Sequence, residues 1–260
     1  MESLKESLMK PLDDTLSLLR TLGPQTPTAQ LRVSRFFVAG SGVLTLAFDG
    51  FTAGLLGIKR HLARGLAPEY PGSTWPKITL AALADPVPLS DKELAVLWSA
   101  TSYADSMILA EAPELEVSEL MVVQALTRSL EMKGHSERIP LVAGNERTVP
   151  DEQRAYVDTV LSQWRSAPSE RYQSILRKTG HGRQHYHRPC RAYTLVSYQS
   201  SPIPAVDVLR ERLDRVLPGR YHWFEPSARH LTIRTLERAT APRESEFESI
   251  EFLAHHNLDA

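Results

Sequence analysis

Lys77–Leu80 (KITL) and His230–Ile233 (HLTI) decide the fold, because each closes one copy of a pattern that occurs twice in the chain. The first copy begins with Leu44–Phe48 (LTLAF), the second with Tyr193–Tyr198 (YTLVSY). In both, a strand-like stretch precedes apolar residues at helical spacing, a turn, and a strand that opens with a polar residue, a hydrophobe and a threonine. From strand to motif threonine the chain runs 35 residues in one copy (79 minus 44) and 38 in the other (232 minus 194). This similarity indicates an internal duplication.

Further elements are predicted around the two copies. Ser90 and Glu93 form a capping box that opens a helix over 90–102. Apolar periodicity predicts helices over 2–22, 150–164, 204–217 and 244–253, and a hairpin of 119–126 with 136–142. We therefore predict an α+β fold with two pseudo-symmetric lobes of antiparallel sheet, flanking helices and a central groove. The predicted segments are an N-terminal helix and linker (1–30), a first lobe (31–142), a basic insertion (143–191) and a second lobe (192–260).

Composition narrows the classes of partner. The net charge of −1 provides no global attraction to nucleic acid or to a membrane surface, so an anionic ligand needs a local patch. No apolar run approaches the roughly 20 residues that span a bilayer, and the first residues lack the apolar core of a secretory signal. The single cysteine, Cys190, excludes an internal disulfide framework. We expect a cytoplasmic protein with no membrane or DNA partner.

The two motif strands carry the candidate chemistry. Residues i and i+2 of a strand point to the same face, so His230 and Thr232 project together, as do Lys77 and Thr79. Arg234 would continue the row of His230. A histidine titrates near neutral pH and can act as acid or base, whereas an unperturbed lysine stays charged and holds an anion. A His-X-Thr strand is also common for purely structural reasons, because threonine favours strands.

Tyr193–Leu236, with its HLTIRTL strand at 230–236, resembles one half of the two-histidine phosphoesterase superfamily, which includes cyclic nucleotide phosphodiesterases and RNA ligase-like proteins. Residues 44–83 resemble the other half, with Lys77 in the position of its first histidine. The resemblance implies a bilobal fold and metal-independent attack on a 2′,3′-cyclic phosphate or 2′-5′ linkage of a nucleotide or RNA end. His230, Thr232 and Thr79 would be catalytic, and Lys77 and Arg234 would bind the phosphate.

Because Lys77 replaces a histidine, a second hypothesis is a non-catalytic module that binds nucleotide or RNA phosphate. A third is a protein–protein adaptor that uses the helix over 2–22. The sequence defines neither the exact substrate nor the oligomeric state.

A histidine-rich segment offers a competing site. His181, His185, His187 and Cys190 fall within ten residues, but their spacing matches no standard zinc site, and we predict no metal and no cofactor. His185 or His187 could instead supply the missing histidine in space. The basic residues between Arg165 and Arg191, with interleaved aromatics, could follow a single strand of nucleic acid or form a solvated face.

Overall fold

The computed structural model describes residues 2–69, 71–85, 87–165 and 182–240. The helices are α1 (Glu2–Leu22), α2 (Ala53–Ala63), α3 (Asp91–Glu111), α4 (Asp151–Arg165), α6 (Arg183–His187) and α7 (Pro204–Val216). The strands are β1 (Pro27–Val38), β2 (Leu44–Phe48), β3 (Lys77–Leu83), β4 (Glu114–Val117), β5 (Glu119–Ala125), β6 (Lys133–Pro140), β7 (Val142–Glu146), β8 (Arg191–Tyr198), β9 (Tyr221–Trp223) and β10 (His230–Thr240). Short 3-10 turns are η1 (Gly23–Gln25), η2 (Pro71–Ser73) and η3 (Pro226–Ala228).

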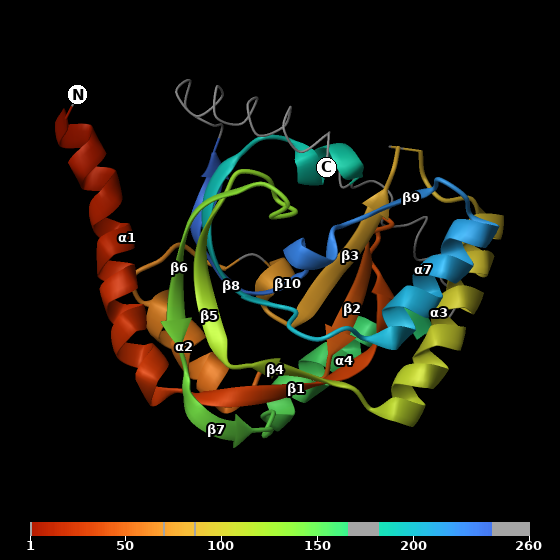
Figure 1. Ribbon diagram of the computed structural model, residues 1–260, viewed down its shortest axis with the longest axis horizontal. Helices are drawn as coiled ribbons and strands as arrows, with labels where there is room; N and C mark the ends of the chain where they lie inside the picture. Colours follow the sequence, from red (N-terminus) through yellow and green to blue (C-terminus); the bar gives the residue numbers. More distant parts are fainter. Residues whose placement is uncertain (1, 70, 86, 166–181, 241–260) are drawn as a thin grey trace.

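One curled sheet organises the chain. Its strands follow the order β4-β1-β2-β3-β10-β8-β5-β6, with β7 added to β1 and β9 added to β3. All pairings are antiparallel except that of β7 with β1. The sheet bends into a half-barrel with helices on its outside, and α6, drawn in cyan, lies across the open side (Figure 1). The predicted α+β class is confirmed.

The duplicated pattern is visible in the centre of the sheet. Copy one is β2-α2-β3 and copy two is β8-α7-β10, and in each copy the two strands are antiparallel neighbours. The copies meet where β3 pairs with β10, at Leu231 and Ile78. An approximate two-fold axis through this pair relates Lys77 to His230 and Thr79 to Thr232. The structure thus equates the same residues that the sequence motif aligned.

Strands that are far apart in the sequence also pair across the boundaries of the predicted segments. The hairpin of β5 and β6 was predicted from sequence and is present, but it extends the sheet beside β8 of the second copy. In the other direction, β9 from the second copy pairs with β3 of the first. Strands of the segment 31–142 therefore pair with both sides of the second copy, and one sheet continues across residue 142.

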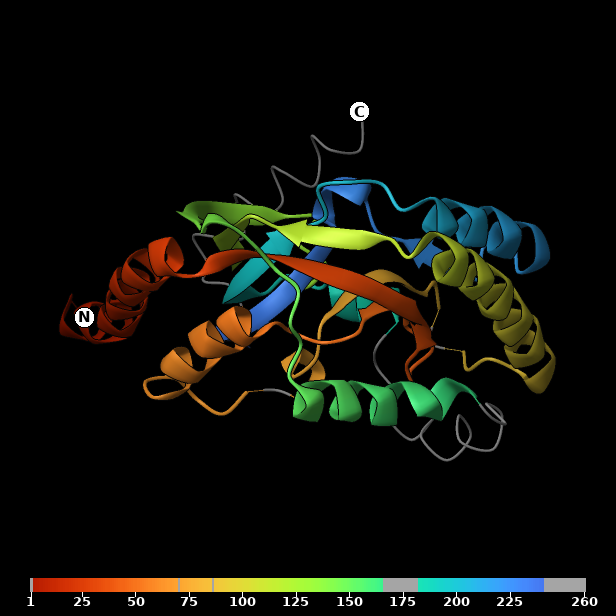
Figure 2. The same ribbon diagram turned by 90° about the horizontal axis from the view of Figure 1, so that it is seen from below.

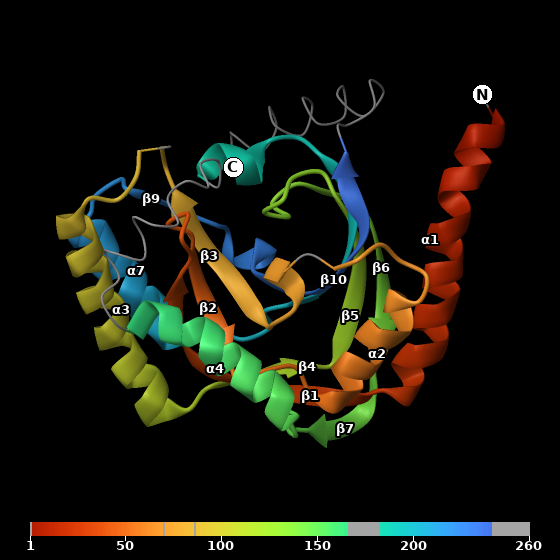
Figure 3. The same cartoon turned by 180° about the vertical axis from the view of Figure 1, so that it is seen from behind.

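The helices cover the sheet in two groups. In Figure 2 the yellow α3 and blue α7 lie together at one end, while α1 and α2 lie at the other and green α4 runs below β1. Seen from behind, α2 and α4 lie in front of the strands (Figure 3). The predicted capping box opens α3: the Ser90 hydroxyl accepts from the Glu93 amide at 3.3 Å, and the Glu93 carboxylate accepts from the Ser90 amide at 2.7 Å. This helix continues to Glu111, past the predicted end at 102.

One strand was not expected from the sequence, and one expected helix falls outside the described residues. The strand β1, which pairs between β4 and β2, was not predicted. It begins within the segment 1–30, which was assigned to an N-terminal helix and linker. The helix expected over 244–253 lies outside the described residues. None of the helices in the described part of the chain is long and apolar enough to cross a membrane.

Candidate functional site

A cavity of about 280 Å³ lies on the inner face of the half-barrel, where the two copies meet. We call β3 and β10 the floor of the cavity, and its walls come from η2 and Trp75, from the loop after β5, from α6 and from Phe224. Its lining consists of Gly72, Ser73, Trp75, Lys77, Thr79, Arg128, Ser129, His185, Tyr186, Phe224, His230, Thr232 and Thr235. Among these described residues there are cationic side chains and no carboxylate, so the cavity suits an anion.

Four of the predicted site residues share the floor of this cavity. They are Lys77, Thr79, His230 and Thr232. Between these four residues, Leu231 of β10 pairs with Ile78 of β3, and both of these side chains are fully buried. Because the strands are antiparallel, Thr79 lies beside His230 and Lys77 beside Thr232 on the exposed face. One anion could therefore contact a cation and a hydroxyl from each copy.

His230 is held in a defined tautomer. Its Nδ1 lies 2.7 Å from the carbonyl oxygen of Ala228, which can only accept, so Nδ1 carries the proton. In the neutral ring Nε2 is then the unprotonated nitrogen. Burial lowers the pKa of His230 and nearby Lys133 lowers it further, against the opposing effect of the bond to Ala228. The imidazole is therefore neutral at pH 7 and Nε2 can accept a proton.

Lys77 is an unusual lysine. Its Nζ donates to the carbonyl of Gly72 and lies 4.2 Å from the centre of the Trp75 ring, a cation–π distance. Burial and the nearby ammonium of Lys59 lower the pKa of Lys77 to about 8, although Glu69 opposes the change. Near neutral pH the group is mostly charged, yet it releases a proton far more readily than an ordinary lysine.

A buried ionic cluster of Lys59, Glu69 and Arg234 supports the floor. Lys59 is only 6% exposed; it donates to the Glu69 carboxylate, to the Ser73 carbonyl at 2.8 Å and to the carbonyl of Ile233. The same ammonium therefore joins α2, η2 and β10. Two members of the cluster also act on Lys77 in opposite directions: Lys59 lowers its pKa and Glu69 raises it, each by less than burial lowers it.

Arg234 is not on the cavity floor, which corrects its predicted place beside His230 and Thr232. Between Thr232 and Arg234 the register with β8 shifts at a bulge, so the two-residue alternation ends there. Thr235 lines the cavity in its place. The guanidinium of Arg234 instead contacts Glu69 at 3.3 Å and the Ala67 carbonyl at 2.9 Å.

One wall of the cavity was not identified from sequence. Arg128 and Ser129 belong to a tight turn in which Leu130 adopts a φ of +59°, rare for a leucine. The Leu130 side chain is buried against β5 and β8, which holds this strained turn in place. The turn places Arg128 and Ser129 in the lining of the cavity, while the Ser129 hydroxyl itself lies 3.2 Å from the hydroxyl of Thr127. A positive φ at a non-glycine residue leaves no signal in the sequence.

The other wall residues are aromatic. Tyr186 and Phe224 lie with ring centroids 5.1 Å apart, and Trp75 also lines the cavity. Burial raises the pKa of Tyr186 to about 12, so its phenol remains neutral. Flat rings beside a cationic floor are suited to the combination of a nucleobase and a phosphate.

The histidine-rich segment is divided by the fold. His185 lines the cavity opposite the motif strands, as one of the alternatives for a missing histidine required. His187 points instead towards Glu131 and His222. Cys190 is buried, and burial raises the pKa of its thiol. His181 and the basic residues between 166 and 181 lie outside the described residues.

Comparison with known proteins adds no relative: neither a family model, nor a curated protein, nor a solved structure matches this chain.

Proposed function

We propose that this cavity binds the phosphate of a nucleotide or RNA end and hydrolyses a 2′,3′-cyclic phosphate or a 2′-5′ phosphodiester, in the manner of the two-histidine phosphoesterases. The observation that carries the proposal is the symmetric arrangement of Lys77, Thr79, His230 and Thr232 on the floor of one cavity. A doubled, cationic, hydroxyl-bearing floor is matched to a phosphodiester, which offers two equivalent non-bridging oxygens.

The residues suggest a division of roles. Nε2 of His230 takes a proton from the attacking water while the water oxygen forms a bond to phosphorus. The bond from phosphorus to one ribose oxygen breaks, and the Lys77 ammonium gives that oxygen its proton. Thr79 and Thr232 donate hydrogen bonds to the non-bridging oxygens, and Arg128 adds positive charge from the wall. From a cyclic phosphate the product is a nucleoside 2′- or 3′-monophosphate with one free ribose hydroxyl.

A direct test is turnover of 2′,3′-cyclic AMP by the full chain in EDTA, followed by chromatography of the monophosphate product. Lys77→Ala and His185→Ala should be assayed beside the wild type, because both side chains could donate the leaving-group proton. We expect the larger loss from Lys77→Ala. Absence of both turnover and nucleotide binding across cyclic and 2′-5′ substrates would remove the proposal.

The pH dependence of kcat/KM should be a plateau with two limbs. On the alkaline side the rate should fall by half at about pH 8, where Lys77 loses its proton. On the acid side it should fall only below the ordinary histidine pKa, since that of His230 is lowered. Lys77→Arg should be slower, because the guanidinium does not release a proton to the leaving oxygen, and its remaining activity should show no alkaline limb near pH 8. An alkaline limb that persists in this variant would exclude Lys77 as its source.

Thr79→Val and Thr232→Val should each lower kcat/KM by about 10- to 100-fold, the worth of one hydrogen bond to a charged group. The two losses should be similar because the pseudo-two-fold axis relates the hydroxyls. Thr159→Val, on the exposed face of α4, serves as the control and should leave the rate unchanged. A loss confined to one threonine would contradict symmetric phosphate binding.

A second candidate function is nucleotide binding without turnover. It is favoured by the fixed position of the Lys77 ammonium, held by the Gly72 carbonyl and Trp75. Calorimetry with a nucleoside 2′-monophosphate distinguishes the two: binding that is weakened by Lys77→Ala, in a protein inert towards every substrate, identifies a binding module.

A further inference from the structure

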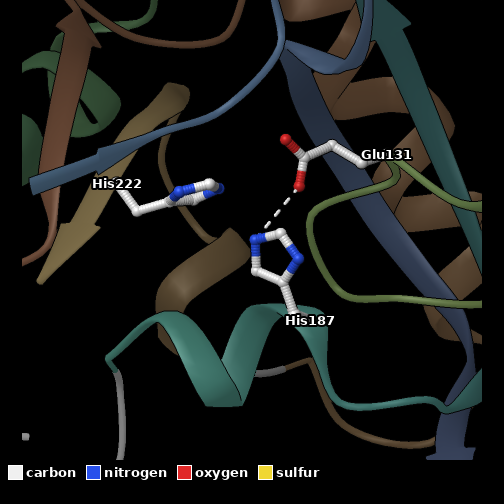
Figure 4. Close-up of side chains that lie close together, drawn as sticks. All are labelled: Glu131, His187 and His222. Atoms are coloured by element: carbon white, nitrogen blue, oxygen red, sulfur yellow. Dashed lines mark ion pairs between the residues drawn. The ribbon is translucent and has the colours of Figure 1, made fainter. Parts of the chain in front are cut away.

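A separate cluster of ligating side chains lies behind the cavity wall. Glu131 from the turn after β5, His187 from the end of α6 and His222 from β9 point towards one another (Figure 4). One ligand atom from each lies within 4.8 Å of the other two. None of the three lines the cavity described above.

Within the described part of the chain, three atoms of this cluster are buried without a hydrogen-bond partner: Glu131 Oε2, His187 Nε2 and His222 Nε2. His187 Nε2 approaches Glu131 Oε2 to 3.3 Å, but the geometry makes no hydrogen bond. Burying one unpaired polar atom costs about 1–3 kcal/mol, and three together need a common explanation.

The individual side chains are held ready to ligate. Glu131 uses its other oxygen, Oε1, to accept from the amide of Glu225 at 3.0 Å, which orients the carboxylate. The rings of His187 and His222 meet edge to face with centroids 4.7 Å apart.

We propose that Glu131, His187 and His222 form a binding site for a divalent transition-metal ion, with Zn²⁺ as the best match. Two imidazoles and a carboxylate are an established zinc donor set, which leaves a fourth position for water. Ligand atoms bound at about 2.0–2.2 Å lie roughly 3.3–3.5 Å from one another. The histidine–glutamate approach is already that short, so the ion needs only a small inward rotation of the side chains.

The surrounding charges permit a cation. Arg183 on α6 is the cationic side chain that acts on both histidines, and Glu131 and Glu225 oppose it. With the carboxylate as ligand and Glu225 nearby, the negative charge offsets Arg183. Hard ions such as Mg²⁺ prefer oxygen ligands and should bind weakly here.

A metal ion at this site would affect the cavity through the backbone segments that the two sites share. Each of its three segments also supplies cavity residues: Ser129 precedes Glu131, Tyr186 precedes His187, and Phe224 follows His222. A bound ion would join these segments and stiffen the aromatic wall. The inference does not depend on the proposed phosphodiesterase, since the site is defined by its own ligands.

Metal binding is measured on the full, chelator-stripped chain by competition of Zn²⁺ with a chromophoric chelator, and by the visible absorption of Co²⁺. We expect one ion per chain and a Co²⁺ spectrum of four- or five-coordinate geometry. At a hundredfold excess of free Zn²⁺ over Kd, Tm should rise by about 5–10 °C.

The variants His187→Ala, His222→Ala and Glu131→Gln should each weaken Zn²⁺ at least about 100-fold. Glu131→Gln is the decisive one, because the amide still accepts from Glu225 and the apo fold is kept. The control is His135→Gln, which removes an exposed histidine on β6 and should leave Kd unchanged. Zn²⁺ affinity and Tm shift equal in wild type and Glu131→Gln, or no binding by the wild type, would overturn the site.

Discussion

His230→Ala should lower kcat for 2′,3′-cyclic AMP hydrolysis by about 10²- to 10⁴-fold, the contribution of a positioned general base. The bond from Nδ1 to the Ala228 carbonyl leaves Nε2 unprotonated, and the lowered pKa keeps it so at pH 7. Alanine removes this acceptor but leaves the phosphate-binding threonines and Lys77 in place. KM should therefore change much less than kcat, which steady-state kinetics will measure.

Two further variants serve as controls for His230→Ala. His61→Ala removes an exposed imidazole on α2 and should keep full activity. His230→Gln retains a polar side chain of similar length that has no basic nitrogen, and should be as slow as the alanine variant. Recovery of activity in the glutamine variant would show that His230 only orients the substrate. Equal rates for wild type and His230→Ala would exclude it from the chemistry.

Sequence reasoning located the floor of the site because the floor is local. Lys77 and Thr79 lie within one strand, as do His230 and Thr232, and period-two alternation fixes their direction. The duplication then indicated that the two strands belong together. That step needed no knowledge of the surrounding fold, since related segments pack about an approximate two-fold axis.

Sequence reasoning did not identify the residues that form the walls of the cavity. The bulge before Arg234 depends on how β10 pairs with β8, so alternation alone misplaced that side chain. Arg128 comes from a turn, Tyr186 from the short helix α6 and Phe224 from the loop after β9, and the positions of these segments follow from pairings distant in sequence. The ligand cluster of Glu131, His187 and His222 combines a turn, a helix and a strand that are far apart in the sequence, which explains why local spacing predicted no metal. Strand β1 was missed because it follows a proline-rich stretch typical of a linker.

Lys59→Met should destabilise the protein by about 3–5 kcal/mol, the cost of removing one partner of a buried ion pair. The methionine can fill the space of the lysine stem, but among the described residues Glu69 then keeps only Arg234 as an ionic partner, and the carbonyls of Ser73 and Ile233 lose the Lys59 donor. Urea unfolding should show a lower midpoint with an unchanged m-value. The exposed Lys92→Met on α3 should stay within about 0.5 kcal/mol of wild type.

The same substitution has a second readout that a packing defect would not produce. The ammonium of Lys59 lowers the pKa of Lys77, so its removal should move the alkaline limb of the rate profile above about pH 8. Adding Glu69→Gln should lower the stability further, because the buried Arg234 then loses its carboxylate partner, and should move the limb back towards its wild-type position, because Glu69 raises the pKa of Lys77. If Lys59→Met unfolds at the wild-type midpoint and keeps the wild-type limb, the cluster neither supports the floor nor tunes Lys77. The opposite pair of results would mean that one buried cation stabilises β10 and adjusts the proton affinity of another.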